Sequence, residues 1–238
     1  MSENTLAERS QPFLAETERW LSNLPEISMA QAAPHPERAA VVSIDVTNGF
    51  CYTGPLSSPR VAGIVQPVRD LFLTAWDHGI RQIVLTQDTH DPQAVEFHEW
   101  PPHCVRGTIE AEAVPEIKSL PFFDQILVLP KNSINPGFNT GLEAWLEQHP
   151  ELDTFIAVGD CTDLCTYQLA MYFRVRANAR QQQGVRVIVP ANAVDTYDMP
   201  VETARAVGAL PHPADLMHAL FLYHMALNGV EVVRRIGR

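Results

Sequence analysis

The stretch TFIAVGDCTDLC, residues 154–165, joins an apolar run to a helical pattern and sets the frame for the fold. Its first five residues predict a buried strand, and a helix is predicted from Leu164 to about Arg180. Cys165 then stands where a strand ends and a helix begins. Free amides and the positive end of the helix dipole lower the pKa of a thiol at such a place, with Thr162 or Asp163 as the expected cap. A buried structural cysteine is the competing interpretation of this motif taken alone.

Strand and helix patterns alternate on both sides of this stretch. Five further apolar runs predict strands, at residues 40–44, 82–86, 125–129, 185–189 and 230–233. Helices are predicted at residues 58–77, 140–149 and 214–228. We therefore expect an α/β fold with three layers, α/β/α, around a mainly parallel six-stranded sheet of Rossmann-like type. Ligands bind at the carboxyl ends of the strands in such folds.

The chain is expected to divide into an extension and one domain. Residues 1–38 form the predicted N-terminal helical extension, because residues 5–24 are amphipathic and a Pro-His-Pro segment at 34–36 follows them. Residues 39–238 form the predicted α/β domain. The extension is expected to pack on this domain or on a neighbouring subunit.

Composition excludes several classes of protein. The 238 residues carry a net charge of −11, which argues against nucleic acid as a partner. No apolar stretch approaches the roughly 20 residues that span a bilayer, so no membrane partner is expected. The start of the chain lacks a basic region followed by an apolar one. With four cysteines, which are expected to be thiols, a cytoplasmic protein is predicted.

Reactive side chains follow four of the predicted strands. Asp45 ends the first, Asp88 the second and Lys131 the third, and Cys165 follows the fourth. Each alone has an ordinary structural interpretation, such as a loop carboxylate for Asp45 and a surface charge for Lys131. Because the fold brings these strand ends to one edge of the sheet, the set predicts a cysteine hydrolase.

The loop after the second strand carries a candidate metal site. Asp88, His90 and His103 offer one carboxylate and two imidazoles, a set that suits zinc, iron or manganese. A single D-x-H pair is weak evidence, since such pairs often only bond the backbone. Further candidate ligands in the loop are Glu96, His98 and Cys104.

Five motifs together resemble a known family. They are DxxNGFC at 45–51, DTH at 88–90, WPPHCVxGT at 100–108, Lys131, and GxCTDxC at 159–165. In this order, each at a strand end, they resemble the nicotinamidases of the isochorismatase-like cysteine hydrolases. The resemblance runs from about Ala39 to the C-terminus, and the NGFC and TYDMP segments, at 48–51 and 196–200, are most similar to the plant-like branch.

The resemblance implies a role for each matched residue. Asp45, Lys131 and Cys165 would be the catalytic triad, and the backbone amides of Cys161 and Cys165 would form the oxyanion hole. A cis peptide would lie between Asp160 and Cys161.

The resemblance also implies a metal site and a ring pocket. Asp88, His90 and His103 would hold one divalent metal ion, with zinc as first choice and iron or manganese as alternatives. Many members have a further His where this chain has Ala94, so Glu96 or water would complete the site. The ring pocket would be lined by Phe50, Trp100 and Phe138, although core packing explains Phe138 nearly as well.

The implied activity is hydrolysis of nicotinamide to nicotinate and ammonia through a thioester, a step of NAD salvage. One alternative is a hydrolase of the same fold that acts on a ureido or carbamoyl amide, and such relatives commonly lack the full metal set. A second alternative is a non-catalytic metal-binding or interaction module, since a fold does not dictate function. A homo-oligomer is expected, as for relatives.

Overall fold

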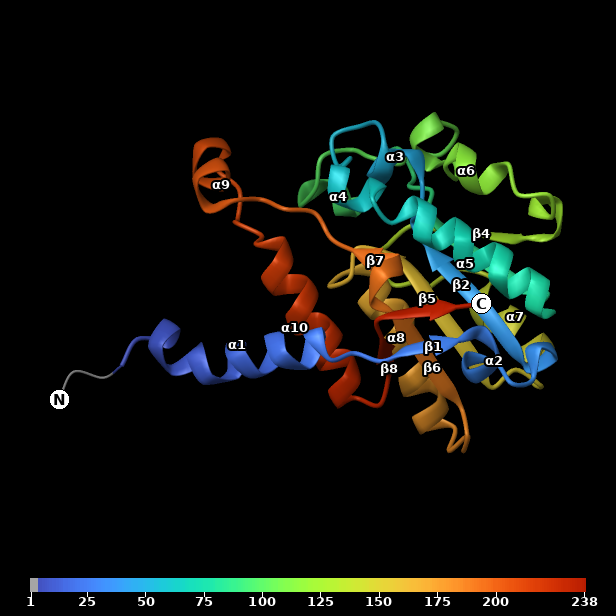
Figure 1. Ribbon diagram of the computed structural model, residues 1–238. Helices are drawn as coiled ribbons and strands as arrows, with labels where there is room; N and C mark the ends of the chain where they lie inside the picture. Colours follow the sequence, from blue (N-terminus) through green and yellow to red (C-terminus); the bar gives the residue numbers. More distant parts are fainter. Residues whose placement is uncertain (1–3) are drawn as a thin grey trace.

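A parallel sheet forms the centre of the computed structural model, which describes residues 4–238 (Figure 1). Its strands lie in the order β4-β3-β2-β5-β6-β8, and β7 pairs with the end of β5. Their bounds are β2 (Ala39–Ile44), β3 (Gln82–Asp88), β4 (Leu127–Lys131), β5 (Thr154–Asp160), β6 (Arg186–Pro190), β7 (Val194–Asp195) and β8 (Glu231–Val233). Every ladder in this sheet is parallel. The predicted α/β architecture is thereby confirmed, with seven strands in place of six, because the two residues of β7 are too few to give a sequence pattern.

Helices cover both faces of the sheet. On one face α5 (Val65–His78) buries Val68 and Phe72 against Val41 of β2 and Ile156 of β5. The opposite face is covered by α7 (Leu142–Gln148), α8 (Cys165–Ala179) and α10 (Ala214–Leu227). Every residue of β2 and of β5 is buried, as expected for central strands packed on both sides.

The helix predicted at 58–77 is divided in two. It consists of α4 (Pro59–Ala62) and α5, with Gly63 and Ile64 between them. Glycine is a poor helix former, which accounts for the break. Gly79 ends α5 in the left-handed conformation, with φ of 108°. The remaining short helices are α2 (Met29–Ala32), α3 (Asn48–Cys51), α6 (Pro115–Lys118) and α9 (Val201–Val207).

The N-terminal segment is helical, as predicted, and is tied to the C-terminal part of the chain. The first helix, α1 (Leu6–Ser22), begins with a capping box between Thr5 and Glu8. Phe13 and Trp20 pack edge-on against Tyr223 of α10. Beyond α1, β1 (Glu26–Ser28) pairs in parallel with β9 (Arg235–Gly237) in a separate two-stranded sheet.

The order of the strands reverses at the middle of the main sheet. From β2 the chain adds β3 and β4 on one side, and later β5, β6 and β8 on the other. In open α/β sheets this switch point opens a crevice at the carboxyl ends of the two central strands. Asp45 directly follows β2, and residues 161–165 directly follow β5. Among residues 4–238, no helix combines the length and the apolar character needed to cross a membrane.

Candidate active site

The turn from β5 to α8 carries the candidate nucleophile. Gly159 has a φ of +122°, and a Cβ there would lie 1.9 Å from the carbonyl oxygen of Ile44. Only glycine therefore lets this turn pass so close to β2. The peptide between Asp160 and Cys161 is cis, as the family resemblance implies. Because α8 begins at Cys165, the N–H of Cys165 is among the amides without an acceptor inside the helix.

The predicted side-chain cap of this helix is wrong. Leu164 occupies the N-cap position, and no side chain caps the helix. The carboxylate of Asp163 turns away to His212, where Oδ2 lies 2.7 Å from Nε2 of the imidazole.

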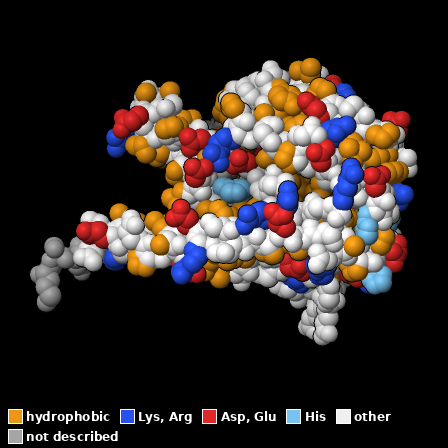
Figure 2. Space-filling view, in the orientation of Figure 1, with side chains coloured by type: hydrophobic (Ala, Val, Ile, Leu, Met, Phe, Trp, Pro, Cys, Tyr) orange, Lys and Arg blue, Asp and Glu red, His pale blue; other side chains and the backbone are white. Residues whose placement is uncertain are grey.

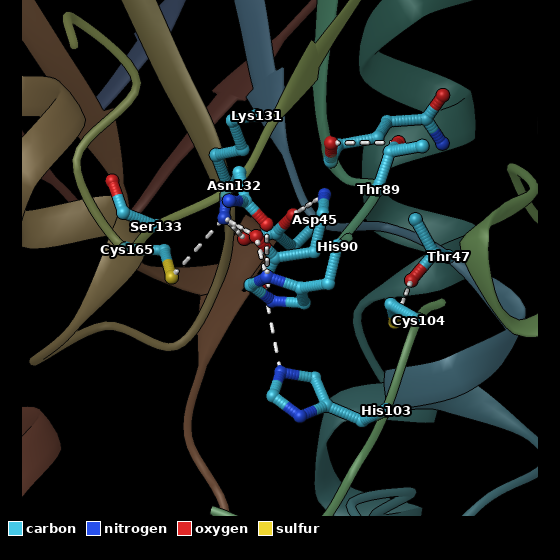
Figure 3. A network of polar contacts seen from close by, with 12 residues as sticks. Asp45, Thr47, Thr89, His90, His103, Cys104, Lys131, Asn132, Ser133 and Cys165 are labelled. Atoms are coloured by element: carbon cyan, nitrogen blue, oxygen red, sulfur yellow. Dashed lines mark hydrogen bonds and ion pairs between the residues drawn. The ribbon is translucent and has the colours of Figure 1, made fainter. Parts of the chain in front are cut away.

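Lys131 lies at the centre of the candidate triad (Figure 3). Its Nζ lies 2.7 Å from Oδ2 of Asp45 and donates to Sγ of Cys165 at 3.7 Å. It also donates to Oδ1 of Asp88 at 2.5 Å. Oδ1 of Asp45 accepts the backbone N–H of Asp88 at 2.7 Å. The structure therefore brings Asp45, Lys131 and Cys165 together as the sequence predicts.

Burial and neighbouring charges shift the pKa values of two side chains of this group. Burial, followed by the charge of Asp88, raises the pKa of Asp45 to about 7, against the opposing charge of Lys131. Burial also raises the pKa of the Cys165 thiol, which Lys131 only partly offsets. The pKa of Cys165 is therefore raised, contrary to the expectation from its place at the helix N-terminus. The thiol needs a base, and a carboxylate with a pKa near 7 is suited to that work.

Asp88, His90 and His103 form a group that fits a metal ion. One potential ligand atom from each lies within 4.8 Å of the others, and all three side chains are buried. Nδ1 of His90 faces Oδ1 of Asn132 at 3.1 Å, while Nε2 is buried without a hydrogen bond among the described residues. Nδ1 of His103 donates to the carbonyl oxygen of Pro101 at 2.8 Å, which leaves Nε2 as the unprotonated nitrogen. Metal-binding histidines are commonly oriented in this way through their second nitrogen.

The other candidate ligands lie outside this group. Glu96 is half-buried and its pKa is raised, first by burial and then by Asp88, but it is not among the clustered ligands. His98 is exposed. The thiol of Cys104 is buried and contacts Oγ1 of Thr47 at 3.8 Å, so this cysteine occupies a structural position.

The predicted pocket aromatics separate into two kinds. Phe50 is buried and packs edge-on against the ring of His103, with centroids 5.5 Å apart. Trp100 is half-buried and faces Tyr197, with centroids 6.0 Å apart. Phe138, in contrast, is 69% exposed and makes no aromatic contact with the site. The loop after β4 leaves its ring at the surface.

Sequence reasoning missed three residues near these groups. Phe97 packs against the rings of both His90 and His103, at 5.4 and 5.7 Å between centroids. Asn132 orients His90, and its place directly after Lys131 at a strand end is a signal that could have found it. Tyr197 reaches the site from the TYDMP segment, which the family resemblance singled out without giving the tyrosine a role in the site.

Comparison with known proteins identifies the family of this chain. The isochorismatase domain family matches residues 39–233. The chain belongs to the isochorismatase family. Nicotinamidase 1 of Arabidopsis thaliana is 30% identical to it over 217 residues, which cover 83% of this chain and 86% of that protein.

Solved structures of this isochorismatase-family fold include two of different specificity. The pyrazinamidase of Pyrococcus horikoshii in complex with zinc superimposes with a TM-score of 0.62 at 22% identity, covering 83% of this chain and 99% of that chain. The N-carbamoylsarcosine amidase of Thermoplasma acidophilum superimposes with a TM-score of 0.61 at 23% identity, covering 83% and 96%. At these identities the likeness concerns the fold alone.

Proposed function

We propose that this protein is a metal-dependent nicotinamidase, an amidohydrolase that converts nicotinamide and water to nicotinate and ammonia. The observation that carries the proposal is the contact of Lys131 with both Asp45 and Cys165, directly beside the Asp88-His90-His103 group. The similarity to Nicotinamidase 1 supports the choice of substrate. The reaction would belong to NAD salvage.

The side chains supply a complete path for the protons. Asp45 takes the proton of the Cys165 thiol, and the thiolate attacks the carboxamide carbon. The oxygen of the tetrahedral intermediate takes up negative charge beside the backbone amides of Cys161 and Cys165. Asp45 returns its proton to the departing amine, so ammonia leaves and a thioester remains. Water then adds to the thioester carbon and Asp45 takes a proton from it. The carbon–sulfur bond breaks to release nicotinic acid and the Cys165 thiolate, Asp45 returns its proton to the thiolate, and the acid loses its proton to solvent as nicotinate. The positive charge of Lys131 stabilises the negatively charged forms of Asp45 and Cys165 during the reaction.

The metal has a separate place in the proposal. Asp88, His90 and His103 would hold one divalent ion, zinc first, and this ion would supply a Lewis acid for the pyridine nitrogen of the substrate. Glu96 is not needed as a ligand in this arrangement. Phe50 and Trp100 would contact the ring, while the exposed Phe138 is omitted from the pocket.

The nearest alternative is hydrolysis of a ureido or carbamoyl amide, as in the amidase of Thermoplasma acidophilum. A free pyridine nitrogen is absent from such substrates. The clustered ligands beside the triad favour the pyridine amide. The second alternative, a non-catalytic module, does not account for a buried cysteine, carboxylate and lysine in contact.

We also propose that copies of this chain associate, with residues 39–238 as the catalytic domain and residues 1–38 as an extension. The accessible surface is 12099 Å², whereas a compact monomer of 26.5 kDa exposes about 10,700 Å². The excess, on the order of 1,000 Å², suffices for one side of a stable interface. Helix α10 is apolar nearly all round, yet only three of its residues are buried. Figure 2 shows hydrophobic side chains on the projecting helices.

A cytoplasmic location suits four unpaired cysteines.

The test of the nucleophile is the Cys165→Ala variant, with nicotinate formation as the readout. We expect turnover to fall at least about 1,000-fold, because the thioester cannot form. Cys51→Ala is the matched control, since Cys51 is also a buried free thiol but lies in the core. Retained turnover in Cys165→Ala, with folding unchanged, would remove Cys165 from the mechanism.

A further inference from the structure

Asp163 and His212 form a hydrogen-bonded pair beside the nucleophile turn, and the proposed reaction does not use this pair. Oδ2 of Asp163 lies 2.7 Å from Nε2 of His212, and both residues are buried. Nδ1 of the same ring lies 2.8 Å from the carbonyl oxygen of Tyr197. Because carbonyl and carboxylate oxygens only accept, the two bonds form together when both ring nitrogens carry a hydrogen. His212 thus joins the nucleophile turn to the segment that carries Tyr197.

This segment is the base of a projecting arm. After β7 the chain leaves the sheet, forms α9 away from the main body and returns to α10 (Figure 1). The two ends of the arm are joined at Met199 and His212, whose backbone N–H and C=O groups exchange two hydrogen bonds of 2.8 Å. Asp198 accepts the N–H of Ala214 at the start of α10. Figure 2 shows the α9 lobe standing apart from the rest of the surface.

The same histidine fixes the ring of Tyr197. The rings of Tyr197 and His212 are stacked, with centroids 3.9 Å apart and planes 12° from parallel. Tyr197 also meets Trp100 edge-on, at an interplanar angle of 89°. Trp100 belongs to the loop that carries His103. Tyr197 therefore stands between the nucleophile turn and the metal-site loop, held by a residue more than ten positions away.

We propose that the Asp163–His212 pair is a latch that holds Tyr197 opposite Trp100, and that Tyr197 is a specificity-determining wall against which a flat substrate ring packs. The inference rests on the proposed function for the identity of the ring. Tyr197 contacts the substrate, whereas His212 is a positioning residue that acts through Tyr197. Packing against this ring strengthens the binding of a flat aromatic carboxamide, whereas it adds little to the binding of a flexible ureido amide.

The experiment compares variants of the metal-replete, full-length protein in nicotinamide hydrolysis. Tyr197→Leu should raise KM about 3- to 10-fold, the range expected for loss of one aromatic contact, with kcat within about 2-fold. Tyr197→Phe should keep KM within about 2-fold, because it keeps the flat ring. His212→Asn should raise KM as Tyr197→Leu does.

A double variant tests whether His212 acts through Tyr197 or whether the two substitutions act independently. The variant with both Tyr197→Leu and His212→Asn should have a KM no higher than Tyr197→Leu alone, since both changes remove the same contact. His149→Asn is the matched control, because His149 also pairs with a carboxylate, Glu151, at 3.0 Å, but away from the site. It should leave both constants unchanged. Unchanged KM in Tyr197→Leu, additive effects in the double variant, or a fall in kcat alone would overturn the inference.

A second readout needs no substrate. Amide hydrogen exchange in the peptide that contains residues 196–199 should quicken at least about 10-fold in His212→Asn, and should stay unchanged in His149→Asn. Equal exchange in wild type and His212→Asn would overturn the latch. If the wild-type protein leaves nicotinamide intact, the proposed function fails, while this exchange measurement still decides whether His212 holds the segment.

Discussion

Lys131 is the residue on which the charges of the site depend. It is fully buried and lies within 2.7 Å of two carboxylates, which keep its pKa well above the usual value for lysine against the effect of burial. With Lys131 charged, Asp88 is held ionised, and its pKa stays below the usual value although burial opposes this. Asp45, by contrast, has a raised pKa. Two neighbouring carboxylates with pKa values moved in opposite directions can divide the roles of metal ligand and base.

The residue-scale prediction concerns the metal. His90→Ala removes the proposed ligand whose Nε2 lies 3.4 Å from Oδ1 of Asp88 and makes no hydrogen bond among the described residues. Bound metal should therefore fall to less than about a tenth of an ion per chain, and KM for nicotinamide should rise at least about 10-fold. His98→Ala, an exposed histidine of the same loop, should keep the full metal content. Elemental analysis of the two purified variants is the measurement. Full metal in His90→Ala would exclude this residue as a ligand.

Single residues were predictable from sequence where they lie at the end of a strand. Asp45 directly follows β2, Asp88 and Lys131 are the last residues of β3 and β4, and Cys165 ends the turn after β5. The structure places the four side chains in contact through Lys131. The direction in which the pKa of the thiol shifts was not predictable, because burial depends on packing around the whole site. Tyr197 was missed for a related reason, since its neighbours Trp100 and His212 come from other segments.

At the scale of elements, the close contact of β2 with the turn after β5 holds Cys165, the proposed nucleophile, in place. Gly159→Ala would force a Cβ to within 1.9 Å of a backbone oxygen and would strain a φ of +122°. We expect the free energy of unfolding to fall by more than about 3 kcal/mol. Gly184→Ala is the matched control. It also has a positive φ, 78°, but nothing lies within 4 Å, so a loss of about 1 kcal/mol is expected.

Urea denaturation of the two glycine variants measures this difference. Equal losses of stability would mean that the contact between the turn and β2 does not constrain the fold.

The helices and strands themselves were predictable from the periodicity of the sequence, since all six predicted strands and the main helices occur. The break between α4 and α5 and the strand β7 were not, because a single glycine and a two-residue strand are too short to change a periodic pattern.

At the scale of the whole molecule, the projecting helices expose apolar side chains that the packing of a single chain does not explain. Leu216 and Leu227 of α10 are exposed, 39% and 68%, and Phe13 of α1 lies beside an apolar hollow lined by α8 and α10. Apolar surface of this extent is typical of an interface between subunits. The pairing of β1 with β9, at opposite ends of the chain, could not be predicted, because three-residue strands have no readable pattern.

The whole-molecule prediction concerns this surface. Wild-type protein should sediment as an oligomer, and the variant with Leu216→Glu and Leu227→Glu should sediment as a monomer, because charges cannot be buried there unpaired. Val95→Glu is the matched control, since Val95 is an exposed apolar side chain of the loop after β3. Analytical ultracentrifugation at equal concentrations is the measurement. A monomeric wild type, or an oligomer unaffected by both substitutions, would contradict the proposed assembly.

The central claim is that the buried triad and the adjacent ligands together hydrolyse a pyridine amide. Ammonia release from nicotinamide by metal-replete protein, before and after removal of metal by a chelator, tests it most directly. We predict steady release that falls at least about 10-fold on chelation and returns when zinc is restored. No release from metal-replete, folded protein, with release instead from a ureido or carbamoyl amide, would contradict the claim.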